Sequence, residues 1–253
     1  MRRLIIVLLL FCCIDAIAQE RSFFLTVQSN TEGTPLFYAD EIDNISFTDA
    51  AIVIHPKTGG EQSFAKADLQ WIIFTEDTHT AVDLGLSVKW ATCNLGGDAP
   101  QDYGLLYSWG ETSTKSDYSE GHYKYYSQGQ YQYIGTNICG TGYDIAHQSW
   151  GGNWRLPTRS EMKDLTTLCT WKPEELEGVT GYRVTGPNGN SIFLPSAGYK
   201  DGTERKGTGV EGFYWTGSLN RDMPSSAYNI NFRGYDAEWS ASRAYGFSVR
   251  PVR

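Results

Sequence analysis

The most reactive side chains in this sequence are cysteines, and three of them lie beyond residue 18: Cys93, Cys139 and Cys169. In an oxidising compartment, at most one internal disulfide can form among three thiols. We prefer the pair Cys93–Cys169, because closing so long a loop stabilises a fold by roughly 4 kcal/mol in the chain-entropy model. The alternative, three buried thiols that behave as small apolar side chains, stays open.

The remaining candidates for catalysis or metal binding form no recognisable set. The four histidines have neither paired spacing nor an adjacent cysteine, so no zinc site is expected: His55, His79, His122 and His147. The sequence has no nucleophile-elbow motif. Carboxylate pairs for glycoside cleavage cannot be chosen from spacing, because their separation depends on the fold. We predict no catalytic residue, no metal and no cofactor.

The strongest indication of a binding surface is the tyrosine loop, residues 112–143, which is too long for a plain connection and has no long apolar stretch to bury. Tyrosine offers a flat apolar face and a polar rim, which suit stacking on sugar rings or docking on a protein. The alternative, that these rings cover the core, stays open. The candidate ligand-binding residues are Tyr118, Tyr123, Tyr125, Tyr126, Tyr131 and Tyr133.

A second candidate surface is the C-terminal patch, residues 219–243, which mixes aromatic and guanidinium groups near chain turns. An arginine stacked on tryptophan or tyrosine can form a binding face, or it can be an internal cation–π support. The candidate residues are Arg221, Arg233, Tyr235, Trp239 and Arg243.

The stretch WGGNWRLPTRSEM, residues 150–162, has the pattern of a structural corner. Thr158 and Glu161 match a capping box that begins a helix after Pro157. Met162, Leu165 and Leu168/Cys169 then follow at helical spacing. Glu161 resembles a catalytic acid, but capping the Thr158 N–H explains it more simply. We therefore assign Trp150, Trp154, Arg155, Pro157, Thr158 and Glu161 to the scaffold.

The first 18 residues predict a secretory signal peptide: Arg2-Arg3, an apolar run, and Ala16-Ile17-Ala18 before Gln19. A lipid anchor at Cys12-Cys13 is the less favoured alternative. The chain is thus expected to be periplasmic, on the cell surface or extracellular, with no transmembrane segment after cleavage. The net charge of −8 and the lack of a Lys/Arg run exclude nucleic acid as an expected partner.

Residues 19–77 predict a small β module with a 27-residue repeat, in which PLFYADEIDNISF (35–47) realigns with QSFAKADLQWIIF (62–74). Each copy follows an expected hairpin, FFLTVQ with PLFYA in the first and AIVIHP with EQSFA in the second. Two copies are too few for a solenoid, so we expect the copies to pair with each other. Self-assembly through exposed strand edges in residues 20–77 is a further expectation.

Residues 78–253 predict one larger domain, rich in glycine, tryptophan and tyrosine. GPNGN (186–190) is a strong hairpin signal, because Asn-Gly readily adopts positive φ. Strands are expected near 82–91, 105–109, 181–184, 191–194, 213–216, 227–232 and 245–252.

Several motifs occur here in an order that resembles the Fibrobacter succinogenes major paralogous domain family, over about residues 80–253. They are VDLGLSVKWATCNLG (82–96), YGLLYSWGE (103–111), WGGNWRLPTRSEMKDL (150–165), CTW (169–171), GYRVTGPNGNSIFLPSAGY (181–199), YWTGS (214–218) and GFSVRPVR (246–253). The Trp-Gly-Glu element, with Trp109 and Glu111, is more distantly similar to the C-type-lectin-like superfold, which includes sulfatase-modifying enzymes.

The resemblance implies an α+β fold: a C-type-lectin-like looped antiparallel sheet with one or two helices, its terminal strands paired, here preceded by the two-repeat β module. Loops of such a fold cluster at one end, so the tyrosine loop and the C-terminal patch are expected to converge. The activity of the sulfatase-modifying enzymes is excluded, because no cysteine follows Cys169. A lectin-type calcium site is not expected, because Gly186-Pro187-Asn188 lacks the required acid.

These observations predict an exported, non-enzymatic binding module that recognises a glycan, another surface polymer or a surface protein through aromatic-rich loops. Two alternatives stay open. One is a structural or adhesive subunit that assembles through the β module, and the other is a polysaccharide-active enzyme.

Overall fold

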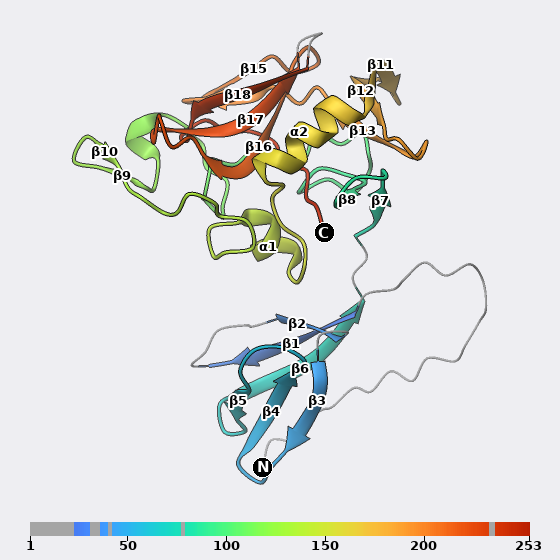
Figure 1. The fold of residues 1–253 in the computed structure, drawn as a ribbon. Helices are drawn as coiled ribbons and strands as arrows, with labels where there is room; N and C mark the ends of the chain where they lie inside the picture. The colour runs from blue at the N-terminus through green and yellow to red at the C-terminus, as the bar shows by residue number, and fades with distance from the viewer. Residues whose placement is uncertain (1–22, 31–35, 40–41, 77–78, 233–235) are drawn as a thin grey trace. The chain divides into compact units, whose positions relative to one another are not determined.

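A computed structural model describes residues 23–30, 36–39, 42–76, 79–232 and 236–253 of the chain. The chain divides into two compact units, Met1–Thr78 and His79–Arg253, close to the boundary expected from the sequence (Figure 1). The expected signal peptide, 1–18, lies outside the described residues. Within the described ranges, no helix has the length and apolar character needed to cross a membrane.

The first unit consists of two three-stranded antiparallel sheets with the strand orders β2-β1-β6 and β3-β4-β5 (Figure 1). Both predicted hairpins are confirmed, since β1 pairs with β2 and β4 pairs with β5. The strands are β1 (Phe23–Ser29), β2 (Leu36–Tyr38), β3 (Ile42–Phe47), β4 (Ala51–Pro56), β5 (Gln62–Ala65) and β6 (Leu69–Glu76).

The two repeats exchange their third strands. Strand β3 of the first copy pairs with β4 of the second, and β6 of the second copy pairs with β1 of the first. The core follows the same 27-residue shift: Val27 matches Ile54, and Phe37 meets its repeat partner Phe64 edge-on with ring centroids 6.1 Å apart. The expected pairing of the copies is therefore confirmed, whereas self-assembly with another chain stays a prediction.

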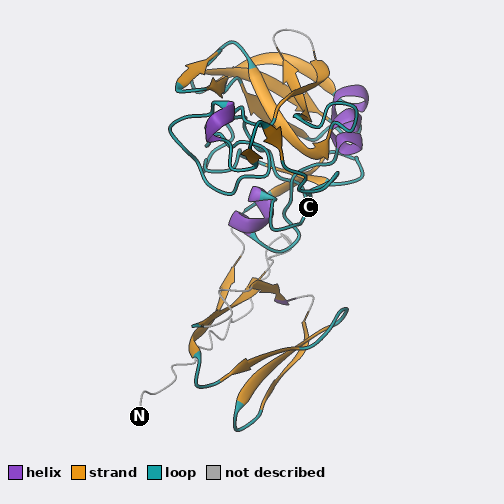
Figure 2. Cartoon of the chain, turned by 90° about the vertical axis from the view of Figure 1, so that its left-hand side faces the viewer, coloured by secondary structure: helices purple, strands orange, loops and turns teal. Residues whose placement is uncertain are grey.

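The second unit is rich in antiparallel β structure and contains two α-helices in its described part, which makes it α+β (Figure 2). Its larger sheets have the orders β11-β12-β13 and β16-β17-β18. The elements are β7 (Ala81–Asp83), β8 (Lys89–Ala91), η2 (Glu120–His122), β9 (Tyr126–Ser127), β10 (Gln130–Tyr131), α1 (Ile145–Trp150), α2 (Arg159–Leu168), β11 (Thr170–Leu176), β12 (Val179–Thr185), β13 (Ser191–Pro195), β14 (Tyr199–Asp201), β15 (Glu204–Lys206), β16 (Gly212–Leu219), β17 (Ser226–Phe232) and β18 (Asp236–Ser242).

The beginning and the end of the second unit are hydrogen-bonded to each other, as expected from the resemblance. The Lys89 N–H donates to the Arg253 carbonyl at 2.9 Å, and the Arg253 N–H donates back to the Lys89 carbonyl at 3.0 Å. Arg250 strengthens this closure, because its buried guanidinium donates to Asn94 and to the backbone carbonyls of Ala91 and Phe193. The finer C-type-lectin-like classification stays a prediction.

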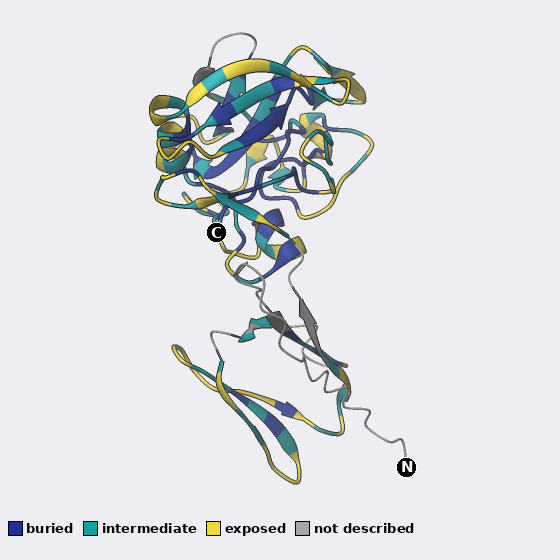
Figure 3. Cartoon of the chain, turned by 90° about the vertical axis from the view of Figure 1, so that its right-hand side faces the viewer, coloured by how far each residue is buried: buried dark blue, intermediate teal, exposed yellow. Residues whose placement is uncertain are grey.

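The core of the second unit lies on both faces of the β16-β17-β18 sheet. Successive side chains of a strand point to opposite faces. Accordingly, Trp215 belongs to one buried cluster with Trp109 and Trp154, whereas its neighbour Tyr214 belongs to the other. Figure 3 shows the buried positions of this unit as the dark blue parts of its ribbon. Helix α2 contributes Met162 and Leu165 to the second cluster, which fixes the start of the helix against β16 and β17.

Four of the predicted strands and the 186–190 hairpin are present in the structure. The Gly186 N–H donates to the Asn190 carbonyl at 2.9 Å, and Gly189 has φ of 88°. Residues 82–91 form two short strands rather than one. The predictions of strands at 105–109 and 245–252 were wrong. These segments form isolated bridges such as Tyr107–Phe247 and Tyr214–Ser248 instead of a continuous ladder, and Gly104 and Gly110, both with positive φ, flank the first of them.

Candidate functional site

The buried carboxylate of Asp144 accepts four backbone hydrogen bonds, and one of them comes from Leu156 in the stretch 150–162. Oδ1 accepts from Ala146 and His147 and caps α1, while Oδ2 accepts from Gly140 and Leu156. Burial raises the pKa of the Asp144 carboxyl, and the four N–H donors oppose that shift. Asp144 therefore joins three chain segments at one point, and the sequence analysis did not identify it.

The capping box predicted at the start of α2 is present. Glu161 Oε2 accepts from the Thr158 N–H at 2.8 Å, and the Thr158 hydroxyl accepts from the Glu161 N–H at 3.2 Å. Arg155 adds a two-point contact, donating to Glu161 Oε1 at 2.6 Å and to Oε2 at 2.8 Å. Both carboxylate oxygens of Glu161 thus face the entrance of its own helix, as the capping-box pattern predicted.

We expect Glu161→Gln to lower the free energy of unfolding by about 1–2 kcal/mol at neutral pH, because it weakens a cap and removes a partly buried ion pair. Burial alone would raise the pKa of Glu161, but Arg155 and the Thr158 N–H outweigh it and hold the pKa below its usual value. A lowered folded-state pKa stabilises the fold above the unfolded pKa of about 4.3, and that stabilisation is lost as the pH falls through the folded value.

Denaturant unfolding at a series of pH values measures this effect. The control is Glu175→Gln, since Glu175 is exposed. The deficit of the Glu161 variant should shrink below about pH 4, whereas the control should match the parent protein throughout. Equal curves for the two variants would contradict the role assigned to Glu161.

The tryptophans of the resemblance motifs are core residues, except Trp171, which is partly buried and packs against the core. Trp150 and Trp154 meet edge-on with ring centroids 5.0 Å apart, and His79 stacks on Trp150 at 3.9 Å. Trp109 is buried and donates its Nε1–H to the Thr216 carbonyl at 2.9 Å. Buried Glu111 accepts from the Lys115 ammonium at 2.8 Å and from the Lys124 N–H at 2.7 Å. Each of these polar groups is therefore committed to internal contacts.

The predicted disulfide Cys93–Cys169 is not formed, and Cys93, Cys139 and Cys169 are all free thiols. Cys93 belongs to the cluster of Trp109, whereas Cys169 packs against the cluster of Met162, so the fold holds the two apart. Burial raises the pKa of Cys139 to about 12 and that of Cys169 to about 11. Such thiols stay protonated at neutral pH and are poor nucleophiles.

Two of the predicted ligand-binding tyrosines, Tyr118 and Tyr123, are instead core residues, with exposed fractions of 1% and 2%. Tyr118 donates its hydroxyl hydrogen to the Leu106 carbonyl, and Tyr123 donates to the Trp109 carbonyl at 2.7 Å. Burial raises the pKa of both hydroxyls. They are excluded from a ligand surface because their rings attach the tyrosine loop to the segment 106–109.

Arg243, predicted as a ligand contact, is also buried, with an exposed fraction of 1%. Its guanidinium donates to the Tyr123 hydroxyl at 3.0 Å and to the carbonyls of Gln132 at 3.0 Å and Pro224 at 3.2 Å. The guanidinium carbon also lies over the rings of Trp109, Tyr123 and Tyr131, 4.9–5.5 Å from their centroids. The tyrosine loop and the C-terminal patch thus converge as expected, but they do so inside the protein.

Four other tyrosines of the loop form two ring pairs, each of which contacts the buried Tyr123. Tyr131 lies 5.0 Å from Tyr126 between ring centroids and shares a hydrogen bond of 3.1 Å with Ser242. Tyr125 meets Tyr143 edge-on at 5.5 Å. Tyr133 has 74% of its surface exposed, whereas Tyr125, Tyr126 and Tyr131 are only partly exposed. Tyr133 alone therefore offers only a small area on which a ligand could stack.

Two candidates of the C-terminal patch, Arg233 and Tyr235, lie outside the described residues. Trp239 lies on β18, where its backbone pairs with Asn229. The structure therefore describes no side chain at these three positions that could contribute to a ligand surface.

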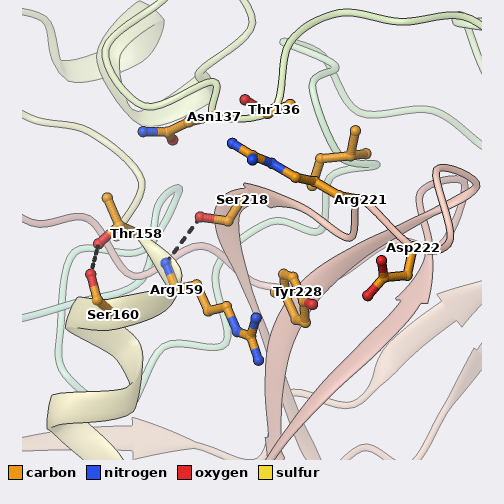
Figure 4. Close-up of a pocket in the computed structure, with 10 residues that line it drawn as sticks. Thr136, Asn137, Thr158, Arg159, Ser160, Ser218, Arg221, Asp222 and Tyr228 are labelled. Atoms are coloured by element: carbon orange, nitrogen blue, oxygen red, sulfur yellow. Dashed lines mark hydrogen bonds between the residues drawn. The ribbon is translucent and has the colours of Figure 1, made fainter.

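A groove of about 490 Å³ lies where α2 begins, and sequence reasoning missed it except for Arg221 and Thr158 (Figure 4). It is lined by the end of the tyrosine loop, the first residues of α2, the turn after β16, and β17. The lining residues are Thr136, Asn137, Thr158, Arg159, Ser160, Ser218, Leu219, Arg221, Asp222 and Tyr228.

The walls of the groove are joined by backbone hydrogen bonds. The Leu219 N–H donates to the Thr136 carbonyl at 3.0 Å, and the Gly217 N–H donates to the Pro157 carbonyl at 2.8 Å. The Arg159 N–H donates to the Ser218 hydroxyl at 3.1 Å (Figure 4). Because its walls belong to joined elements, the groove is largely pre-formed, as ligand sites usually are.

The polar groups of the groove suit an oxygen-rich ligand. The Arg159 guanidinium lies over the Tyr228 ring, its central carbon 3.8 Å from the ring centroid. Hydroxyls of Thr158, Ser160 and Ser218 and the Asn137 amide share the lining. In Figure 4 the Arg221 guanidinium extends toward Thr136 and Asn137. Donors of this kind, beside an aromatic ring, fix the orientation of a hydroxylated ligand.

Among the described residues, no cluster of three or more His, Cys, Asp or Glu side chains is arranged to hold a metal ion. Comparison of the chain with protein-family models, with curated proteins and with solved structures finds no match.

Proposed function

We propose that the protein is an exported binding module that recognises a glycan or related surface polymer, and that the groove at the start of α2 is its binding site. The groove carries this proposal because it combines a concave surface, hydroxyl, amide and guanidinium donors, and the Tyr228 ring. Asp222 is the single carboxylate in its described lining. Glycoside cleavage ordinarily uses two carboxyl groups, so the lining favours binding over hydrolysis.

Export follows from the sequence of residues 1–18, and a cell-surface setting fits the family that residues 80–253 resemble. The C-type-lectin-like classification belongs to the same proposal, since function on such a fold depends on the individual site. The exposed Tyr133 ring of the tyrosine loop becomes a secondary contact for a long ligand.

A glycan array followed by calorimetry on the bound sugars tests the proposal. Arg159→Ala should weaken binding about tenfold or more, because it removes a charged donor and uncovers Tyr228. Tyr133→Ala is the matched control, since it truncates an exposed side chain outside the groove, and it should retain affinity within about threefold.

An array with no bound glycan would contradict the proposed function. Loss of binding in Tyr133→Ala with full binding in Arg159→Ala would place recognition on the Tyr133 ring and would refute the groove as its site.

A further inference from the structure

We infer that Ser46, His55 and Glu61 of the first unit form a serine hydrolase triad that cleaves short-chain esters such as acetyl esters. This inference concerns a different unit from the groove and does not depend on the proposed function. The Ser46 hydroxyl lies 2.7 Å from Nε2 of His55, and Nδ1 of His55 lies 2.9 Å from Oε1 of Glu61. Both distances suit a nucleophile, its base and the group that orients the base.

The sheet β3-β4-β5 carries the three side chains on its outer face (Figure 1). Ser46 lies on β3, His55 on β4, and Glu61 directly before β5. Ile45 and Ile54 precede the first two residues and pack in the core of this unit. Because successive side chains of a strand alternate between faces, Ser46 and His55 point away from that core. His55 and Glu61 have exposed side-chain fractions of 25% and 68%, so a small molecule can reach them.

The hydrogen bonds give His55 the tautomer that a general base needs. A carboxylate can only accept a hydrogen bond, so in the neutral imidazole the Nδ1 hydrogen is donated to Glu61. Nε2 is then the acceptor, and the Ser46 hydroxyl donates to it. A serine hydroxyl is a weak nucleophile until an adjacent base can take its proton.

The repeat shows that the fold itself does not require these polar groups. At the 27-residue shift, His55 matches Gln28 and Ser46 matches Ile73. The sheet β2-β1-β6 is thus built on the same plan without them. The exchange of third strands brings Ser46 of the first copy beside His55 of the second. Sequence analysis found no catalytic set because these residues meet only across neighbouring strands.

The reaction requires only an ester and water. The Ser46 Oγ attacks the carbonyl carbon of the ester while its proton passes to Nε2 of His55. The bond from that carbon to the alcohol oxygen then breaks, and His55 returns the proton to the leaving oxygen. Water, deprotonated by His55, finally attacks the acyl-serine and releases the carboxylic acid, which restores the Ser46 hydroxyl.

The surroundings of the triad favour a short acyl group. Val53 lies opposite Ser46 on the outer face, and Ser63 lies opposite Val53. These small side chains offer little apolar surface to a long acyl chain. Asn44 lies opposite His55 and donates one amide hydrogen to the neighbouring carboxylate at 3.0 Å. Its second amide hydrogen is the donor that we assign to the developing oxyanion.

Labelling of the full protein with a fluorophosphonate, followed by mass spectrometry, tests the inference. An activated serine displaces the fluoride, so the adduct should lie on the peptide that contains Ser46. Ser46→Ala should abolish it, and His55→Gln should slow its formation at least about 100-fold. Ser63→Ala is the matched control, since Ser63 shares the face but has no histidine partner in the described part of the chain, and it should react like the parent.

Hydrolysis of 4-nitrophenyl acetate gives a second measurement. Glu61 is a positioning residue, so Glu61→Gln should lower kcat about tenfold and leave KM and the circular dichroism spectrum unchanged. The octanoate ester should be cleaved more slowly than the acetate, and the reverse order would refute the short-chain preference. Absence of an adduct on Ser46, or equal turnover by the parent and Ser46→Ala, would overturn the triad. Either result leaves the groove to its own test, because Ser46→Ala should still bind the glycan.

Discussion

Arg243→Met is expected to lower the free energy of unfolding by about 3–5 kcal/mol, the largest loss we predict for one residue. Methionine fills part of the volume but leaves three acceptors without their donor: the buried Tyr123 hydroxyl and the carbonyls of Gln132 and Pro224, whose bonds to Arg243 are partly buried. Each buried group left unsatisfied costs about 1–3 kcal/mol. The cation–π contacts with Trp109 and Tyr131 are lost as well.

Arg243 Nη2 has no hydrogen-bond partner among the described residues. The surrounding ring faces offset part of that cost, because an aromatic face attracts a cation. A side chain without a planar guanidinium group is therefore expected to replace Arg243 poorly. We expect Arg243→Lys to recover only part of the stability, since an ammonium cannot reach all three acceptors.

Urea unfolding followed by fluorescence and near-ultraviolet circular dichroism measures the effect of Arg243→Met. Arg221→Met is the matched control, because it makes the same chemical change at an exposed arginine, and it should stay within about 0.5 kcal/mol of the parent. If Arg243→Met were as stable as this control and had instead lost ligand binding, Arg243 would be the ligand contact that its sequence context suggested.

Asp144→Asn is expected to cost about 2–4 kcal/mol, although the two side chains have almost the same shape. Each carboxylate oxygen accepts two backbone N–H groups. Whichever way the new amide turns, its NH₂ group faces two donors and leaves them unsatisfied. Because Asp144 joins α1 to Leu156, we expect the damage to reach the start of α2.

Thermal unfolding by calorimetry measures this loss, with Asp222→Asn as the control at an exposed acid. Hydrogen exchange should show faster exchange of the Leu156 and Ala146 amides in Asp144→Asn. Parent-like stability together with unchanged exchange would contradict the role that we assign to the Asp144 carboxylate.

Local signals in the sequence were reliable where the interaction itself is local. The capping box of Thr158 and Glu161 and the turn at 186–190 involve residues a few positions apart, so residue type was enough to predict them. The 27-residue repeat predicted the first unit because matching positions share one core. The sequence did not predict that the two copies exchange their third strands, because the same side chains are buried whether the third strand pairs within its own copy or with the other copy.

Irregular segments were predicted less well, because buried side chains do not recur there at the regular spacing that marks a helix or a strand. Tyr118 and Tyr123 lie in a polar loop among exposed residues, and nothing in the sequence distinguishes them from Tyr133. The role of Arg243 was ambiguous for the same reason, because an internal cation–π contact and a ligand-binding surface use the same residue types, arginine beside tyrosine and tryptophan. The groove was missed because Thr136, Ser160 and Ser218 are common polar residues that only the fold brings together.

We propose that ligands are held in the groove, while residues 150–162 and Arg243 form the scaffold that supports it. Hydrogen exchange of the protein, with and without the bound glycan from the array, tests this proposal most directly. Protection should concentrate at residues 158–160 and 218–222 and be absent from 125–133. Protection confined to 125–133, with unchanged exchange at the start of α2, would contradict the account.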